Sequence, residues 1–268
     1  MTDASSPDAR PPREIAALVE GLGVAKSRLD PLTLGVLAVL AGAFISLGSM
    51  LYLVVVTGST LGFGVTRLIG GFAFCLGLVL VIVAGAELFT GNNLLAMAWA
   101  SGLVDSRAVG RNWVIAYVGN VIGCLGTVAL VHLSGLQGLG GGSVGATALQ
   151  VAAAKAALPW DQAFARGVLC NALVCLAVWL TQGGHTVTDR ILGIAFPITA
   201  FVALGGEHSI ANWFLLPYGM LLDSAGTLST GHVARNLVAV TAGNIVGGTL
   251  LVAGVYWLAY LRGGRPAR

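Results

Sequence analysis

Charged residues are scarce in this chain. Of its 268 residues only 9% are Asp, Glu, Lys or Arg, while 56% are hydrophobic and the mean hydropathy is +0.88. Soluble domains carry roughly 25% charged residues, so this composition leaves too little polar surface for a fold in water. The bilayer is therefore the expected solvent. The net charge of +3 includes no basic patch interleaved with aromatics, which argues against a nucleic-acid partner.

Residues for metal or enzyme chemistry are also few. Four cysteines lie inside apolar runs without CxxC spacing, which favours small buried hydrophobes over disulfides or metal ligands: Cys75, Cys124, Cys170 and Cys175. Residues 141–145 fit GxSxG, but they lie in a glycine-rich loop without a strand–turn–helix context. No HExxH, Walker or GxGxxG pattern occurs. We expect no enzyme activity, no cofactor, no metal and no transport driven by ATP hydrolysis.

Long apolar runs are what the chain has in abundance. About 20 apolar residues cross the hydrocarbon core, and four runs qualify as single spans: 31–56, 111–134, 160–182 and 235–261. Two further stretches, 66–102 and 188–222, are longer and are interrupted by the polar segments GAELFTGNN (85–93) and GGEHSIAN (205–212). The pattern predicts an all-α membrane protein with six transmembrane helices, of which the second and fifth are broken.

The basic residues predict the orientation in the membrane. Ten of the fourteen Lys and Arg fall on the side of the N-terminus, which favours both termini in the cytoplasm of a bacterial-type inner membrane. Residues 1–30 lack the order of a signal peptide and are expected to be a cytoplasmic segment with a short amphipathic helix. Residues 31–262 then form the pore domain, surrounded by membrane lipid, and 263–268 form a cytoplasmic tail.

An internal repeat links the two halves. RNWVIAYVGNVIG at 111–123 matches RNLVAVTAGNIVG at 235–247, and each broken stretch has a Glu five residues before an Asn. Three spans per half require the second copy to enter from the opposite face, which is the inverted-repeat plan of channels and transporters. The shared GxxxG spacing, Gly119–Gly123 and Gly243–Gly247, indicates close helix packing.

Broken helices at membrane depth indicate a permeation site. Freed backbone groups cannot face lipid, so they line a polar cavity or are buried in protein. A half-helix that begins after each break directs its positive N-terminal end at the site, which favours an anion.

Several side chains near the breaks are candidates for that site. His208 lies within the second break, and an intramembrane ionisable residue is functional by default; the alternative is a buried neutral ring bonded to freed carbonyls. Thr90 offers a hydroxyl to an ion. Glu87 and Glu207 are expected to accept bonds from freed N–H groups in a structural role. Asparagines suit the same support with pore lining as a second possibility: Asn92, Asn93, Asn120, Asn212 and Asn244.

Four segments resemble the signature segments of the formate/nitrite transporter family. They are GAELFTGNN, FARGVLCNALVCLAVW, GGEHSIANWFLLPYG and VTAGNIVGG, within a similarity that covers about residues 31–262. The resemblance implies an aquaporin-like fold, a homopentamer with one pore per subunit, and a mobile Ω-shaped loop at the first break.

The resemblance also implies roles for individual residues. His208 becomes the central pore histidine, with Asn171 and Asn244 near the centre and Lys155 in an outer vestibule. The Ω loop carries Leu88, Phe89 and Thr90, and apolar constrictions are formed on either side by Phe74, Leu78 and Phe201, with Leu88 and Phe89 beside them. For Lys155 a solvated side chain is the alternative to anion capture.

The expected function is passage of a small monovalent anion. Formate ranks first and nitrite second, while hydrosulfide, lactate and acetate remain options, with proton coupling through His208 as a further hypothesis. A different class, a non-transporting membrane sensor or assembly protein, predicts no anion flux.

Overall fold

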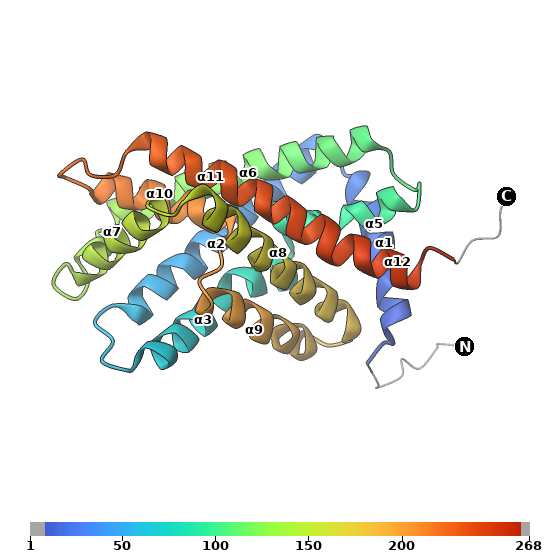
Figure 1. Ribbon diagram of the computed structural model, residues 1–268, viewed down its shortest axis with the longest axis horizontal. Coiled ribbons are helices and arrows are strands. Elements are labelled where there is room, and N and C mark those ends of the chain that lie inside the picture. Colours follow the sequence, from blue (N-terminus) through green and yellow to red (C-terminus); the bar gives the residue numbers. More distant parts are fainter. Residues whose placement is uncertain (1–8, 264–268) are drawn as a thin grey trace.

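The computed structural model describes residues 9–263, and that part of the chain is all-helical, as predicted. Most helices run along one long axis, and both described ends of the chain lie at the same end of the bundle (Figure 1). Residues 1–8 of the predicted N-terminal segment and 264–268 of the predicted tail lie outside the described residues.

The first half of the chain contains α1 to α6. Their bounds are α1 Pro12–Ser27, α2 Pro31–Val56, α3 Phe63–Val79 with the π-helical η1 Leu80–Gly85, α4 Phe89–Asn92, α5 Leu95–Ala100 and α6 Ser106–Leu133. The second half begins with the 3-10 turn η2. Its elements are η2 Leu136–Gly138, α7 Ser143–Ala156, α8 Trp160–Gly183, α9 Val187–Ala203, α10 Ser209–Leu222, α11 Thr230–Val246, the π-helical η3 Gly247–Gly254 and α12 Val255–Tyr260.

Five of the described helices are long and apolar enough to cross a membrane. They are Pro31–Val56, Phe63–Gly85, Ser106–Leu133, Trp160–Gly183 and Thr230–Tyr260. The remaining predicted span is divided between α9 and α10, which have 17 and 14 residues. The first predicted break follows the 23-residue helix Phe63–Gly85, which is long enough to cross a membrane by itself. The sequence predicted a break in the middle of the second span, whereas the structure places it at the end of a complete helix.

Both predicted interruptions are present. The backbone leaves the helix at Ala86, after η1, and again at Leu204, after α9. Gly85 has φ +87° and Gly205 has φ +78°, a conformation that side chains with a Cβ rarely adopt. The glycine at the start of each break is therefore required by the backbone, and these two glycines are 120 residues apart.

The GxxxG glycines allow two pairs of helices to touch. A Cβ on Gly123 of α6 would lie 2.0 Å from the carbonyl oxygen of Val39 in α2, and a Cβ on Gly247 would lie 2.1 Å from that of Val168 in α8. No side chain fits at such a distance, so the predicted packing role of this spacing is confirmed.

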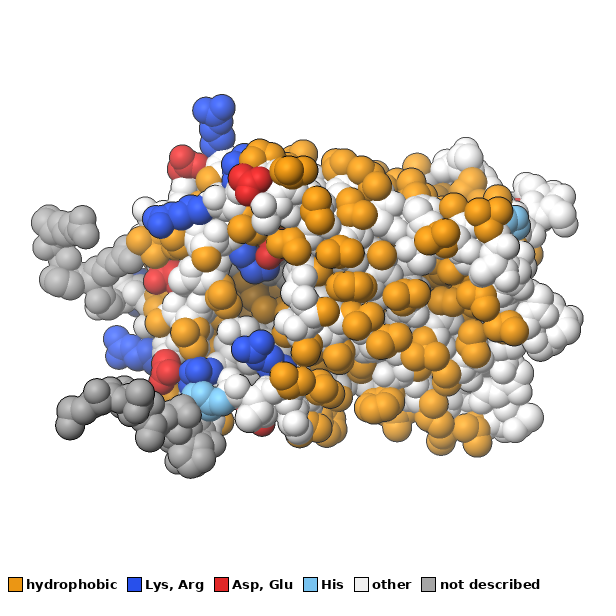
Figure 2. Space-filling model, turned by 180° about the vertical axis from the view of Figure 1, so that it is seen from behind, with side chains coloured by type: hydrophobic (Ala, Val, Ile, Leu, Met, Phe, Trp, Pro, Cys, Tyr) orange, Lys and Arg blue, Asp and Glu red, His pale blue; other side chains and the backbone are white. Residues whose placement is uncertain are grey.

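The amphipathic helix α1 and the helix α7 occupy opposite ends of the bundle (Figure 1). The predicted apolar stripe of α1 is buried at Ile15, Ala16 and Val19. Figure 2 shows charged side chains gathered at the α1 end, while hydrophobic side chains cover most of the rest of the visible face. This distribution fits a bundle that is surrounded by lipid along most of its length.

Candidate functional site

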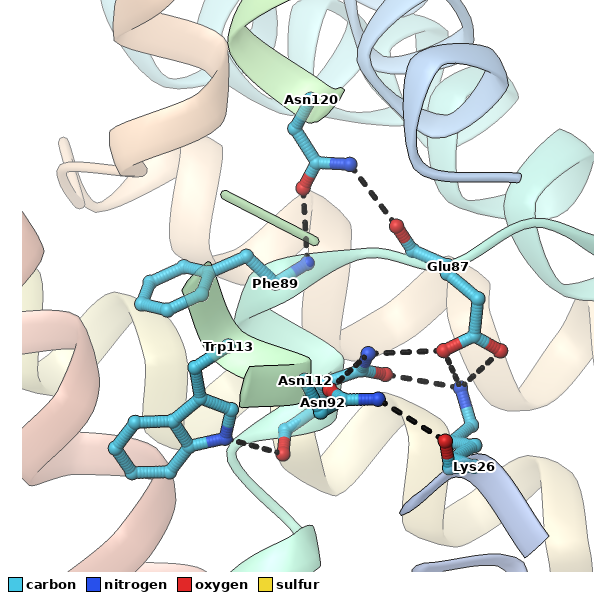
Figure 3. Close-up of polar contacts among 7 residues, drawn as sticks. All are labelled: Lys26, Glu87, Phe89, Asn92, Asn112, Trp113 and Asn120. Carbon is cyan, nitrogen blue, oxygen red and sulfur yellow. Dashed lines mark hydrogen bonds and ion pairs between the residues drawn. The ribbon is translucent and has the colours of Figure 1, made fainter. Parts of the chain in front are cut away.

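A lysine from α1 holds the first break (Figure 3). Lys26 Nζ lies 2.9 and 3.0 Å from the two carboxylate oxygens of Glu87 and donates to Asn92 Oδ1 at 2.9 Å. Asn92 Nδ2 donates to Glu87 Oε2 at 2.8 Å and to Asn112 Oδ1 at 2.9 Å. Asn112 closes the ring of bonds by donating to the backbone carbonyl of Lys26 at 3.2 Å.

A lysine from α7 holds the second break through the corresponding glutamate. Lys155 Nζ lies 2.9 Å from Glu207 Oε1, and Asn212 Nδ2 donates to Glu207 Oε2 at 2.7 Å and to Asn236 Oδ1 at 2.8 Å. Asn236 donates to the backbone carbonyl of Lys155 at 2.8 Å. The two rings, Lys26–Glu87–Asn92–Asn112 and Lys155–Glu207–Asn212–Asn236, are named here the lysine clamps.

The clamps change the expected role of the two glutamates. We predicted that Glu87 and Glu207 would accept bonds from freed backbone N–H groups. Their carboxylates instead accept from lysine and asparagine side chains. A buried carboxylate needs a cation or several donors, and each clamp supplies both.

The freed backbone groups are bonded by asparagines from the third helix of each half. Asn120 Oδ1 accepts from Phe89 N at 2.9 Å, and its Nδ2 donates to the Glu87 carbonyl at 2.9 Å. Asn244 Oδ1 accepts from Ser209 N at 2.8 Å, and its Nδ2 donates to the Glu207 carbonyl at 2.9 Å. Asn244, also predicted near the pore, has its amide taken up by backbone groups, so the structure places it in the support of the break.

His208 and Thr90 bring the two breaks together. His208 Nε2 lies 2.9 Å from Thr90 Oγ1, and both side chains are buried. His208 Nδ1 accepts the backbone N–H of Ala211 at 3.1 Å, which caps α10. A neutral ring that accepts at Nδ1 carries its proton on Nε2. His208 therefore donates to Thr90, and the Thr90 hydroxyl hydrogen is left available for an acceptor.

Asn171 supports the same centre from α8. Its Nδ2 donates to the carbonyl of Asn244 at 2.7 Å, to Asn93 Oδ1 at 2.7 Å and to the carbonyl of Thr90 at 3.3 Å. The amide thus contacts the backbone of Thr90 and not its hydroxyl. Asn171 joins the loop of the first break to the last helix.

Two cavities lie on either side of the His208–Thr90 pair. The Lys155-side cavity, about 190 Å³, is bordered by α7 and by polar and charged residues that include His208, Glu207 and Lys155. The Lys26-side cavity, about 40 Å³, is bordered by α1 and is lined mainly by apolar side chains, with Lys26 and Asn92. Since α1 and α7 lie at opposite ends of the bundle (Figure 1), the cavities lie toward opposite ends.

Apolar side chains line both cavities close to the buried pair. Phe74 and Phe201 line the Lys155-side cavity and meet edge to face, with ring centroids 5.5 Å apart. Leu78 and Leu88 line the Lys26-side cavity, and each is 2% exposed. Phe89 lines neither cavity. Its ring packs against Tyr117 and against Trp113 (Figure 3), so the structure does not bring this residue to a constriction.

Lys155 borders the Lys155-side cavity and is not a solvated side chain, since it is 16% exposed and paired with Glu207. Lys26 was missed, although the sequence offered a signal. KSRLDP at 26–31 and KAALP at 155–159 both place a lysine shortly before a proline that precedes an apolar span.

Arg67 and Arg166 line the Lys155-side cavity. The sequence analysis used these two arginines only in the count of basic residues that predicts the orientation in the membrane.

Comparison with known proteins agrees with this geometry. The family described as formate/nitrite transporter matches residues 13–258. The chain is 38% identical to the formate channel FocA of Escherichia coli K12, over 94% of each chain. It is 40% identical to a probable formate transporter of Methanothermobacter thermautotrophicus, over 85% of this chain and 88% of that one.

A solved structure described as a pentameric formate channel with formate bound has a similar fold. Its TM-score is 0.81 at 36% identity, and the alignment covers 87% of this chain and 98% of that one. The predicted resemblance is therefore confirmed. The chain belongs to the formate/nitrite transporter family and is a multi-pass inner-membrane channel protein of that family, not an enzyme.

Proposed function

We propose that this protein passes formate between the Lys155-side and Lys26-side cavities by way of His208 and Thr90. The observation that carries the proposal is the buried His208–Thr90 pair, which lies between the two cavities, with His208 lining the Lys155-side cavity beside Phe74 and Phe201. The names of the relatives, which include formate channels, support formate as the anion. Nitrite ranks second, followed by hydrosulfide, lactate and acetate.

The polar pair reduces the cost of crossing an apolar constriction. A bare anion loses its hydration between Phe74, Phe201 and the leucines beyond, and an unpaired charge there is expensive. The Thr90 hydroxyl hydrogen, left available by His208, is a donor at that depth. His208 Nε2–H becomes a second donor when the anion takes the place of Thr90 as its acceptor.

Proton coupling is a second mode for the same centre. Full transfer needs a cationic ring: the imidazolium N–H bond breaks, the proton bonds to a formate oxygen, and neutral imidazole and formic acid result. A cationic ring has no acceptor at Nδ1, so it must give up the N–H of Ala211. In the conformation described here, hydrogen-bond donation to the anion is the favoured mode.

The arrangement in the membrane is part of the proposal. We place the Lys26-side cavity and both termini toward the cytoplasm because ten of the fourteen basic residues belong to that side. The two halves then enter the membrane in opposite directions. A homopentamer with one pore per subunit follows the pentameric formate channel that the chain resembles.

Stopped-flow measurement of anion flux in proteoliposomes tests the function. Purified protein is expected to admit formate, and a panel with nitrite, hydrosulfide, lactate and acetate ranks the anions. The substitution His208→Asn should change the flux by at least about tenfold and alter its pH profile. His232→Asn is the control, since His232 is exposed at the start of α11.

Two results would contradict the proposal. Absence of flux for every anion in the panel would favour the sensor or assembly class. Flux and pH profile that are the same in His208→Asn and in the unmodified protein would remove His208 from the pathway.

A further inference from the structure

Two arginines lie together at the second break, outside the clamp that holds it. Arg67 is on α3 and Arg166 is on α8, and both line the Lys155-side cavity. A Cβ placed on Gly205 would lie 3.2 Å from Nη2 of Arg67 and 3.6 Å from Nη1 of Arg166. Two guanidinium groups therefore approach one point on the wall of the cavity.

The bonds of the two arginines differ. Arg67 donates from Nε to the carbonyl of Ala203 at 3.0 Å and from Nη2 to that of Val202 at 2.8 Å, so it is tied to the end of α9. The side chain of Arg166 is exposed and makes no hydrogen bond or ion pair with residues 9–263. Its donors are available to whatever enters the cavity.

The other half of the molecule has no such group at this place. The backbone N–H of Glu207 donates to the carbonyl of Arg166 at 3.3 Å, and that of Glu87 donates to the carbonyl of Leu37 at 3.2 Å. Arg166 thus takes the position that Leu37 has in the first half. The Lys26-side cavity is lined by one charged side chain, that of Lys26, whereas the Lys155-side cavity is lined by three cations and one carboxylate.

The two guanidinium cations repel each other at such close approach, and an anion bound between them offsets this repulsion by attracting both. Glu207 is the carboxylate in the cavity wall, and it is already bonded to Lys155 and Asn212. A guanidinium binds a carboxylate or a small oxyanion through paired N–H donors, and its charge is kept at any pH. The site therefore suits a monovalent anion such as formate or nitrite.

We propose that Arg166, with Arg67 beside it, forms an anion-capture site at the Lys155-side cavity that is separate from the His208–Thr90 centre. The inference rests on the proposed channel function and adds a direction to it. Anions are concentrated at one mouth and not at the other, so half-saturation is reached at a lower concentration for flux from the Lys155 side. Maximal flux is set further in, at the constrictions.

Right-side-out membrane vesicles from a host without its own formate transport test the proposal, because every copy then faces one way. Uptake and efflux are each measured against formate concentration and ionic strength. Arg166→Leu, which copies Leu37 of the other half, should raise the half-saturation concentration about threefold to tenfold in one direction only. It should also weaken the salt dependence of flux in that direction, and Arg166→Lys should keep most of both.

Arg107→Gln is the matched control. It removes one positive charge from an exposed site at the start of α6, and it should leave both directions unchanged. Equal half-saturation and equal salt dependence in Arg166→Leu and the unmodified protein would overturn the capture site. A loss of maximal flux alone would do the same, since it would indicate a structural role. Absence of flux in the unmodified protein would instead refute the channel function.

Discussion

The break in the first half and the break in the second half are held by equivalent residues, although Lys26 donates to three acceptors in its clamp and Lys155 to one. A lysine from an end helix pairs with a glutamate in each break, and two asparagines complete each clamp. A further asparagine bonds the freed backbone on both sides of the pair, Asn120 in one half and Asn244 in the other. The framework is thus present twice.

The side chains that this framework carries are different in the two halves. His208 occupies the place that Leu88 has in the first break, since both residues come directly after the clamped glutamate. Arg166 likewise occupies the place of Leu37. The cavities follow this difference, at about 190 Å³ with several charges and about 40 Å³ with one. The shared residues build the fold, and the departures from the repeat supply the chemistry.

The largest effect should come from a shared feature. Gly123→Ala and Gly247→Ala each force a Cβ to within 2.0 or 2.1 Å of a backbone oxygen, and a helix backbone cannot move aside without separating the pair. We expect a loss of about 3 kcal/mol or more for each, above the usual range for overpacking. The yield of monodisperse protein and its thermal midpoint are the measurements.

Gly126→Ala is the control. Gly126 is on α6 with Gly123, and no neighbouring atom lies within 4 Å of its added Cβ. It should be neutral or slightly stabilising. If Gly123→Ala or Gly247→Ala melts with the unmodified protein, the close contact is not a requirement and the halves are not held as described.

A smaller effect should separate the two clamps. Glu207→Gln and Glu87→Gln each leave a lysine without its counter-charge, and breaking a buried pair costs roughly 3–5 kcal/mol. Lys26 is 30% exposed and Lys155 is 16% exposed, so water screens the first clamp more. We expect Glu207→Gln to lower the thermal midpoint more than Glu87→Gln does.

Double variants measure the clamps directly. Lys155→Gln with Glu207→Gln should recover part of the loss, because no charge is then left unpaired, and Lys26→Gln with Glu87→Gln should recover less. Equal midpoints for the two glutamate variants would show that exposure does not distinguish the halves.

The smallest effect concerns a difference at the start of the second helix of each half. Asp30 caps α2, whereas Pro159 stands at that place before α8 without a side-chain cap. Hydrogen bonds from Thr33, first from its side chain and then from its backbone, lower the pKa of Asp30 below its ordinary value of 3.8. The stability this gives is complete above that value and is lost as the pH falls through the lowered pKa of the folded state.

Asp30→Ala should therefore lower the thermal midpoint by about 2 °C at neutral pH and by less at about pH 3. Thermal unfolding in detergent at the two pH values measures the difference, with Asp105→Ala at the start of α6 as a second capped helix for comparison. A larger difference at acidic than at neutral pH would contradict the sign of this effect.

Much of the site could be predicted from the sequence, because polar residues inside apolar membrane spans cannot face lipid and must be buried in protein or line a polar cavity. The breaks, the burial of His208 and the close packing of the GxxxG glycines all followed from that constraint. The sequence also offered the Thr90 hydroxyl as a partner for an ion, and this hydroxyl lies beside His208. These features depend on residue type and local spacing.

The clamps could not be predicted in the same way. Lys26 and Glu87 are 61 residues apart, and their contact depends on how α1 packs against the end of the bundle. Phe89 illustrates the same limit, since the family resemblance implies a place at a constriction while its ring packs against Trp113 and Tyr117. The direction of a side chain on an irregular loop is set by tertiary packing, which spacing does not report.

The helices α1 and α7 are equivalent parts of the repeat, since each supplies the lysine of a clamp. Because each lysine clamp begins on the helix before the first span of its half, the duplicated unit is longer than three membrane crossings and includes that leading helix. The joint between the copies then falls near Gly140, Gly141 and Gly142, which all have positive φ. The repeated unit is therefore a leading helix together with the spans that follow it, and each copy brings its own lysine.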